Sequence, residues 1–253
     1  MKLPSSYPSP SALCTAAADF WLAAYSAAIL EHGSFHVAFS GGTTPKKLYE
    51  KLATPAYQSK IDWQKVHIYF GDERFVPLDH PDSNYNMASK ALLSHINCPA
   101  ENIHPVSVES GSAEKAAALY EATLRNHLPA NNLPTNNLSI STENKPQFDL
   151  VLLGLGPDGH TASLFPGTDA VNEKVKLCRA VFVEKFDSWR VSITFPVINN
   201  AKKILLLSEG SSKADIIKSL TDDNTPELQY PVQHVSQTNG FSWYVDGAAV
   251  NFK

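Results

Sequence analysis

Residues 149–167 read DLVLLGLGPDGHTASLFPG, and their first half decides the fold. Positions 148–156 are almost continuously apolar, which is typical of a parallel strand covered by helices on both faces. A glycine-rich turn ends this strand, and Asp158 and His160 belong to that turn. The stretch therefore predicts a buried strand whose carboxyl end presents polar side chains at one rim of a sheet.

The rest of the chain alternates between helix-like and strand-like segments. Helical spacing and capping signals predict helices at residues 12–30, 46–53, 83–96, 112–128 and 212–220. Apolar runs predict further strands at 35–40, within 65–77, and at 179–186, 190–196, 203–210 and 241–247. This alternation predicts an α/β fold that is doubly wound, with a mostly parallel sheet and helices on both faces. Ligands of such sheets collect outside the carboxyl ends of the strands, which selects the loops at 40–45, 71–77, 154–160 and 208–213.

The composition is that of an ordinary soluble globular protein, with 43% hydrophobic and 18% charged residues among 253. The net charge of −4 gives no basic footprint for nucleic acid, so an anionic ligand must be held by a few local cations and backbone donors. The cysteines, Cys14, Cys98 and Cys178, are scattered along the chain. They fit neither a disulfide framework nor a zinc site, and they indicate a reducing compartment such as the cytoplasm.

We expect residues 1–253 to form one domain. The apolar run at 12–30 has helical spacing, a start signal at Ser9-Pro10 and a stop at Gly33, which favours a core helix over a targeting or membrane-spanning segment. Residues 129–146 are rich in Asn, Thr, Ser and Pro and too polar to pack, so we expect a flexible surface insertion there.

The spacing Gly154-x-Gly156-x-x-Gly159 matches the turn that cradles a dinucleotide pyrophosphate. In such a site the last glycine opens a full crossover helix, whereas here Pro166 follows within seven residues and a helix could make fewer than two turns. Glu184 could imitate the acid that binds ribose. A plain glycine turn leading into a short helix is the simplest alternative, but it leaves Asp158 and His160 unexplained. We therefore interpret the glycines as presenting His160, a candidate general base.

A second glycine loop, SGGTTP at 40–45, joins an apolar strand to a helix that we expect Pro45 to open. Gly41 and Gly42 allow successive backbone N–H groups to point at one anion, and the hydroxyl groups of Thr43 and Thr44 add donors. The loop lacks the Gly-Lys-Ser/Thr ending of a nucleotide P-loop, so a sugar phosphate fits better than a nucleoside triphosphate. A simple glycine turn is the alternative.

Charged residues occupy the other two loops. The run GDERF at 71–75 offers Asp72 as an acid, a base or an orienting group, and Arg74 as an anion clamp. Arg190 at the start of a strand and Lys213 at the start of a helix are either counter-charges or solvated side chains. A helix N-terminus disfavours a cation such as Lys213 unless an anion lies nearby.

The histidines offer no metal site in this sequence. His32 and His36 have the spacing of two helical metal ligands, but Gly33 is expected to end the helix between them. The remaining histidines do not cluster along the chain.

With these loops assembled, the sequence resembles the 6-phosphogluconolactonase family, which belongs to a wider group containing the glucosamine-6-phosphate isomerase/deaminases. The motifs that carry the resemblance are SGGTTPKKLYEKL (40–52), GDERFVPLDHPDSNYNMA (71–88) and GLGPDGHTASLFPG (154–167), with FSWYVDGAA (241–249) near the end. The isomerase/deaminases have an acid-Glu-Tyr run where this chain has Asp72-Glu73-Arg74. They also have a glutamate five residues after the loop histidine, where this chain has Phe165. Both differences favour the lactonase.

The resemblance implies hydrolysis of 6-phospho-D-glucono-1,5-lactone to 6-phosphogluconate in the oxidative pentose phosphate pathway, with no metal or other cofactor. The catalytic residues would be His160, Asp158, Asp72 and Arg74, and the sequence leaves open which aspartate orients the imidazole. The phosphate and the rest of the substrate would contact residues from all four loops: Ser40, Gly41, Gly42, Thr43, Thr44, Asn84, Gly156, Arg190 and Lys213.

The expected partner is a small sugar phosphate, not a nucleic acid or a membrane, bound by a cytoplasmic monomer or weak oligomer. Two alternatives remain: an amino-sugar-phosphate isomerase or deaminase, and a sensor that binds a sugar phosphate without turnover.

Overall fold

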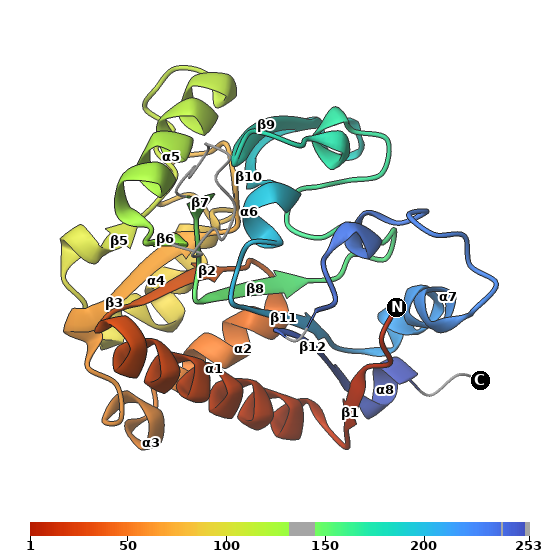
Figure 1. Ribbon diagram of the computed structural model, residues 1–253, viewed down its shortest axis with the longest axis horizontal. Coiled ribbons are helices and arrows are strands. Elements are labelled where there is room, and N and C mark those ends of the chain that lie inside the picture. Colours follow the sequence, from red (N-terminus) through yellow and green to blue (C-terminus); the bar gives the residue numbers. More distant parts are fainter. Residues whose placement is uncertain (132–144, 239, 251–253) are drawn as a thin grey trace, which may run out of the picture.

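The computed structural model describes residues 1–131, 145–238 and 240–250. Its centre is a seven-stranded sheet, in which every neighbouring pair of strands is parallel (Figure 1). The order across the sheet is β1 (Ser5–Tyr7), β12 (Phe241–Asp246), β11 (Lys203–Ser208), β8 (Leu150–Gly154), β2 (Phe35–Phe39), β3 (Val66–Phe70) and β5 (Ile103–His104).

Helices cover both faces of this sheet, as the sequence predicts. The helices are α1 (Pro10–His32), α2 (Thr43–Leu52), α3 (Pro55–Gln58), α4 (Asn84–Ala91), α5 (Ala113–His127), α6 (Phe195–Ile198), α7 (Ala214–Thr221) and α8 (Gly247–Val250). In Figure 1, α1 to α3 lie on one side of the sheet, and α5 and α6 lie on the other. A hydrophobic core lies on each face of the sheet, and alternate residues of β8 point into one or the other. Leu150 and Leu152 pack with α1 and α2, whereas Val151 and Leu153 pack with α5 and α6. The fold is therefore the predicted doubly wound α/β sheet.

Helix α1 is a core helix that begins and ends where its capping residues predict. The Ser9 hydroxyl accepts a hydrogen bond from the backbone N–H of Ala12 (3.2 Å), and Gly33 ends the helix with φ of 83°. Among the described residues, this is the one helix long and apolar enough to span a membrane. Trp21 at its centre is fully buried, with its ring centroid 4.9 Å from that of Phe35 in β2.

The strands β9 (Cys178–Val183) and β10 (Ser188–Ile193) differ from the expectation of one sheet. With β4 (Asp72–Arg74) they form a separate antiparallel sheet in the order β4-β10-β9. The connection between β9 and β10 is a single short turn, in which Asp187 has φ of 44°. A turn of this length can join only antiparallel neighbours, because a parallel crossover needs a dozen or more residues.

One alternative is excluded, and one local expectation is wrong. No helix follows Gly159: residues 160–168, all within the described chain, form turns closed by a bridge between Thr161 and Leu164. The missing crossover helix removes the dinucleotide interpretation of the glycines. Helix α2 begins at Thr43, two residues before Pro45, because Gly42 with φ of 100° takes the N-cap position.

The ends of the predicted insertion at 129–146 pair with each other as β6 (Ala130–Asn131) and β7 (Lys145–Pro146). Residues 132–144, on which the prediction of a flexible excursion mainly falls, lie outside the described residues.

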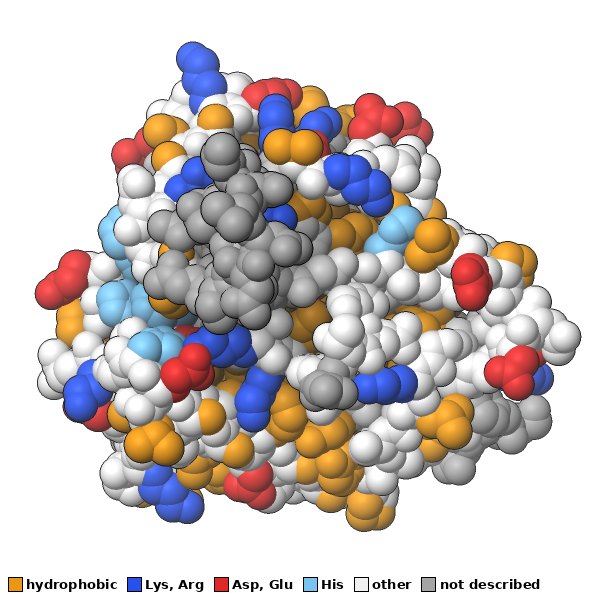
Figure 2. Space-filling model, in the orientation of Figure 1, with side chains coloured by type: hydrophobic (Ala, Val, Ile, Leu, Met, Phe, Trp, Pro, Cys, Tyr) orange, Lys and Arg blue, Asp and Glu red, His pale blue; other side chains and the backbone are white. Residues whose placement is uncertain are grey.

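The histidines do cluster, contrary to the sequence-based expectation. His36 on β2 stacks on His67 on β3 at 4.5 Å between ring centroids, and His67 stacks on His104 on β5 at 5.8 Å. His127 at the end of α5 lies 4.7 Å from His104. Figure 2 shows histidine side chains gathered at the edge of the molecule formed by β3 and β5. Parallel pairing in register brings together residues that lie far apart in the chain.

Burial, together with neighbouring imidazoles, lowers the pKa of His36 to about 3 and that of His104 to about 4. These two imidazoles of the histidine row are therefore uncharged at neutral pH. Nδ1 of His67 and Nε2 of His104 are buried without a hydrogen-bond partner in the described chain. A proton added here would therefore create a buried charge close to other imidazoles.

We expect the free energy of unfolding to fall as the pH drops below about 6.5, the ordinary pKa of histidine. Between about pH 6.5 and about pH 4, His104 is protonated in the unfolded chain but stays neutral in the folded protein. Lowering the pH through this window therefore favours unfolding. Urea unfolding followed by tryptophan fluorescence at a series of pH values measures the slope. His104→Gln should make the slope shallower, whereas His95→Gln at an exposed position is the matched control. Equal slopes for wild type and H104Q would contradict this account.

Candidate active site

A polar cavity of about 220 Å³ lies at the carboxyl ends of the central strands. Strands β2 and β8 are neighbours there, and the chain continues from β2 to β3 in one direction and from β8 to β11 in the other. Ligands of doubly wound sheets bind in the crevice that such a reversal opens. The lining residues are Ser40, Gly41, Gly42, Thr43, Thr44, Pro45, Asp72, Arg74, Asn84, Gly154, Leu155, Gly156, Pro157, His160, Ala162, Arg190, Leu207, Ser208, Glu209 and Lys213. The four loops selected from the sequence therefore do converge.

His160 is held against Asp158 rather than against Asp72. Its Nδ1 lies 2.5 Å from Oδ1 of Asp158, which also accepts the backbone N–H of His160 at 3.3 Å. A proton on Nδ1 shared with a carboxylate leaves the lone pair of a neutral imidazole on Nε2. Asp158 itself is not among the described residues that line the cavity, so a ligand there contacts the imidazole and not this carboxylate.

The surroundings of His160 favour its neutral form. Burial lowers its pKa and outweighs the hydrogen bond and charge of Asp158 and the charge of Asp72, which act in the opposite direction. Burial acts to raise the pKa of Asp158. The hydrogen bond from His160 and the charge of His160 outweigh burial, so the pKa of Asp158 is lowered overall. At neutral pH the pair is therefore a neutral imidazole beside an ionised carboxylate.

The three glycines at the end of this strand differ in why, and whether, each must lack a side chain. A Cβ on Gly156 would lie 1.9 Å from Nδ1 of His160, so the imidazole occupies the space that a side chain would fill. Gly159 has φ of 76°, and a Cβ there would also meet the ring of Tyr230 at 2.7 Å. Gly154, by contrast, would place a Cβ no closer than 3.7 Å to any atom, the nearest being Ser40 Oγ. The glycine spacing that resembles a dinucleotide-binding turn therefore makes room for the His160 imidazole.

Asp72 is buried and engaged with other partners. Its Oδ2 accepts a hydrogen bond from the Ser163 hydroxyl at 2.6 Å, and its backbone oxygen accepts one from the Asn84 amide at 2.8 Å. Asn84 in turn lies against the glycine loop, since a Cβ on Gly41 would be 2.1 Å from Asn84 Oδ1. Asp72 thus ties the loop after β3 to the turn that carries His160 and to the first turn of α4.

The loop at 40–45 presents a helix N-terminus to the cavity. Gly42 provides no side-chain cap for α2 within the described chain, so the first N–H groups of the helix remain available to an anion. The Tyr49 hydroxyl braces the loop by accepting the N–H of Ser40 at 2.9 Å and donating to its carbonyl oxygen at 2.8 Å. Tyr49 was not singled out from the sequence, although a tyrosine two turns into the helix is a candidate for such a contact.

Two arginines lie side by side in the cavity wall. Arg74 on β4 and Arg190 on β10 are direct partners across the antiparallel pair. The Nε atoms of both are buried and have no hydrogen-bond partner in the described chain, and the Arg74 guanidinium donates to the Asp82 carbonyl oxygen at 2.5 Å. Burial lowers the pKa of Arg190 and also that of Lys213, whose charge is favoured by Asp158. Three partly desolvated cations facing one cavity indicate an anionic ligand.

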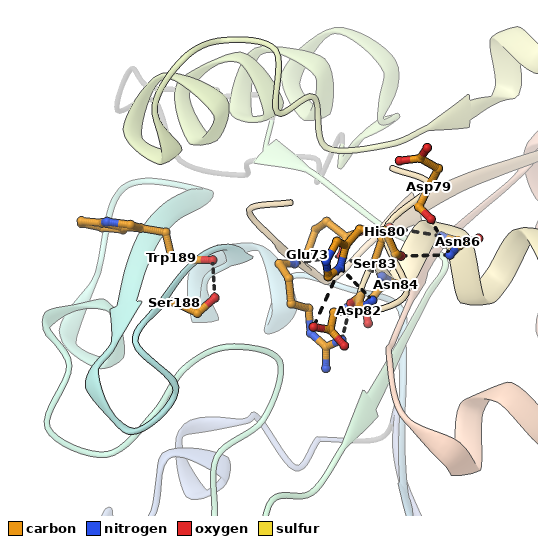
Figure 3. Close-up of polar contacts among 10 residues, drawn as sticks. Glu73, Asp79, His80, Asp82, Ser83, Asn84, Asn86, Ser188 and Trp189 are labelled. Atoms are coloured by element: carbon orange, nitrogen blue, oxygen red, sulfur yellow. Dashed lines mark hydrogen bonds and ion pairs between the residues drawn. The ribbon is translucent and has the colours of Figure 1, made fainter. Parts of the chain in front are cut away.

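Glu73 is a structural residue of the site that sequence reasoning missed. Its carboxylate accepts the N–H groups of Arg74, Asn84 and Tyr85 and the Ser83 hydroxyl, all within 3.0 Å, so it holds the start of α4 (Figure 3). Burial raises its pKa, although these four hydrogen bonds act to lower it. The only signal was its position between Asp72 and Arg74, and nothing local shows that it turns inward.

A second, larger groove of about 1270 Å³ lies between α5 and β9. It reaches Asp158 and Phe165, but neither His160 nor the glycine loop at 40–45 is among its lining residues in the described chain. Glu184, the residue that could imitate a ribose-binding acid, lies in this groove. The convergence of base, cations and helix N-terminus makes the smaller cavity the candidate site.

Comparisons with known proteins agree on a relationship over most of the chain. A family model described as glucosamine-6-phosphate isomerases/6-phosphogluconolactonase matches residues 8–243. The 6-phosphogluconolactonase of Nostoc sp. is 36% identical over 242 residues, which cover 96% of this chain and 94% of that protein. The Haemophilus influenzae 6-phosphogluconolactonase is 37% identical over 219 residues, covering 85% of this chain and 86% of that protein.

Solved structures have the same architecture. A crystal structure of 6-phosphogluconolactonase from Leishmania guyanensis matches with a TM-score of 0.85 and 27% identity, over 99% of this chain and 98% of that one. A monomeric glucosamine-6-phosphate deaminase matches with a TM-score of 0.80 over 99% of this chain and all of that one. Its identity of 18% supports a shared fold alone.

We expect Gly156→Ala to break the contact between His160 and Asp158, because the added Cβ would occupy the place of the imidazole. The downfield NMR signal of a histidine Nδ1 proton bonded to a carboxylate should be present in the wild type and lost in this variant. Gly154→Ala is the matched control and should keep the signal, since its Cβ meets only ordinary van der Waals contact. If the signal persisted in G156A, the His160 imidazole would not occupy the space beside residue 156, which would contradict the structure.

Proposed function

The chain belongs to the family of glucosamine-6-phosphate isomerases and 6-phosphogluconolactonases, and from that premise we propose that it hydrolyses 6-phospho-D-glucono-1,5-lactone to 6-phospho-D-gluconate. The relatives named above that are at least 36% identical are 6-phosphogluconolactonases. One observation carries the proposal: a neutral imidazole backed by a carboxylate shares a small cavity with a helix N-terminus and three cations. The reaction belongs to the oxidative pentose phosphate pathway.

The phosphate of the substrate binds at the loop 40–45. The free N–H groups at the start of α2, with the hydroxyl groups of Thr43 and Thr44, receive its oxygens. Lys213 lies beside another helix start, α7, where a cation is stable only with an anion close by. Arg190 supplies a further counter-charge. Nearby carboxylates compensate only part of the desolvation of these cations, and pairing with a dianion would compensate more of it.

His160 acts as the general base toward water. Nε2 takes a proton from a water molecule while its oxygen attacks C1 of the lactone, and the carbonyl oxygen becomes an oxyanion. The tetrahedral intermediate collapses by breaking the bond between C1 and the ring oxygen. The imidazolium returns its proton to that oxygen, and the carboxylic acid formed then ionises in water. Protons move only between water, His160 and substrate, so the proposal needs no metal or other cofactor.

Asp158 orients the base, and Asp72 has a different role. The contact of Asp158 with Nδ1 supports the first assignment, which the sequence leaves open. Asp72 is tied to Ser163 and Asn84, which suits a residue that fixes the cavity wall and accepts a sugar hydroxyl. Arg74 faces the same cavity and stabilises the oxyanion, because a guanidinium is a strong donor to developing negative charge.

The lining residues come from positions 40 to 213, which supports the proposal that residues 1–253 work as one domain. A cytoplasmic location and a monomer or weak oligomer stay predictions.

Replacing His160 by Asn should lower the enzyme-dependent rate of lactone hydrolysis by roughly 10² to 10⁴-fold, since a positioned general base contributes about that much. Fresh lactone is generated in the assay, and formation of 6-phosphogluconate is compared with the spontaneous background. Binding of the product should change little, because the phosphate cradle is untouched. A rate close to that of the wild type would reject His160 as the base. The same preparation incubated with glucosamine 6-phosphate tests the alternative, since a deaminase would release ammonia.

The pH profile should show an acid limb of kcat/KM below the ordinary histidine pKa, because burial lowers the pKa of His160 and only the neutral imidazole is active. Asp158→Asn removes a hydrogen bond and a charge that raise this pKa, so the limb should move further toward acid. The same variant should lower kcat on the order of 10²-fold, because the Nδ1 proton loses its ionic partner. A limb that moves toward neutral pH in D158N would contradict the assignment of Asp158.

A further inference from the structure

Phe165 lies against the face of the His160 imidazole. Their ring centroids are 4.0 Å apart and their planes differ by 26°. Phe165 is buried, and it is not among the described residues that line the small cavity, so a ligand there meets the imidazole but not the phenyl ring. Any effect of Phe165 on chemistry must therefore pass through His160.

The two contacts of the imidazole restrain different motions. The bond from Nδ1 to Asp158 lies in the plane of the ring and fixes the direction of Nε2 along that plane. It leaves the ring able to tip about the line of the bond. A flat ring stacked on one face blocks that tipping and also excludes water from that face. The pair of contacts fixes the imidazole in a way that neither does alone.

Phe165 also contacts a positive charge. The Arg190 guanidinium carbon lies 5.9 Å from the centroid of the Phe165 ring and 5.2 Å from that of Phe186. The Phe165 and Phe186 rings meet edge to face at 6.0 Å. Cation–π contacts with the two rings therefore help to hold the Arg190 guanidinium in place.

The backbone holds Phe165 rigidly. Its carbonyl oxygen accepts hydrogen bonds from the Thr168 N–H at 3.2 Å and from the Thr168 hydroxyl at 2.8 Å. Gly167 in the same turn has φ of 80°. On the other side, the bridge between Thr161 and Leu164 closes the turn that follows His160. Base and phenyl ring thus belong to one tightly closed segment.

We propose that Phe165 is a positioning residue for lactone hydrolysis, which acts by fixing the ring plane of His160 and covering one face of the imidazole. This inference rests on the proposed function. The charged groups around the imidazole are Asp158, Asp72 and Lys213, and Arg190 contacts the phenyl ring. Since none of these changes when Phe165 is replaced, the effect of a substitution reports on the ring itself.

The test compares Phe165→Leu with Phe165→Tyr, which keeps the ring. We expect F165L to lower kcat by roughly 10- to 100-fold, because small misplacement of a reacting group has effects of that size, with KM within about twofold. Its acid limb should move up toward the ordinary histidine value, because water reaches the exposed face of the imidazole. F165Y should stay within a few-fold of the wild type in both respects. Phe165→Met, whose unbranched side chain adapts to irregular space, gives the same readouts if F165L does not fold.

Phe182→Leu is the matched control, since Phe182 is a half-exposed aromatic residue of β9 that does not contact His160. It should leave kcat, KM and the pH profile unchanged. An unchanged kcat and acid limb in F165L, a change in KM alone, or equal losses in F165L and F165Y would each overturn the proposal. An NMR titration of His160 distinguishes failure of the proposed lactonase activity from failure of the Phe165–His160 contact. If the wild type proves inactive on the lactone, the proposed function fails, and with it this role of Phe165. The titration then tests only the packing: a shift in F165L but not in F165Y supports the contact, and no shift in either refutes it.

Discussion

The hydrogen bond between His160 and Asp158 is the interaction on which the site depends, and it exists because residue 156 has no side chain. A β-carbon at that position would lie 1.9 Å from the imidazole nitrogen that makes the bond. The turn is held in place by the bond from the Gly156 N–H to the His160 carbonyl oxygen (2.8 Å) and by that from the Val232 N–H to the Gly159 carbonyl oxygen (3.0 Å). The His160 imidazole is therefore fixed by backbone geometry first and by its carboxylate partner second.

The rest of the site is built onto this turn through buried polar contacts. Asp72 connects the turn, through Ser163, to Asn84 at the start of α4, and Glu73 fixes that helix start with three hydrogen bonds. Both buried carboxylates accept hydrogen bonds, which compensate part of the cost of burying them beneath a small cavity. The antiparallel pairing of β4 with β10 adds the two arginines to the same wall.

Much of this arrangement could be predicted from sequence, for a physical reason. Apolar runs such as 148–156 identify buried parallel strands, and parallel strands bring the loops after them to one rim, so His160, Asp72, Lys213 and the loop at 40–45 could be placed together. What the sequence could not show is long-range register. The pairing of Arg74 with Arg190, the inward turn of Glu73 and the stacking of His36 on His67 depend on which distant residues become neighbours. The short turn between β9 and β10 did carry a usable signal, since it was too short for a parallel crossover.

The central claim is that one ligand spans from the helix N-terminus at Thr43 to the imidazole of His160 within the smaller cavity. A crystal structure of the protein with 6-phospho-D-gluconate tests it most directly. The account predicts the phosphate on the first N–H groups of α2 near Lys213, with the carboxylate carbon beside Nε2 of His160. A ligand in the groove between α5 and β9, or a phosphate beside His160 with the carboxylate at α2, would contradict it.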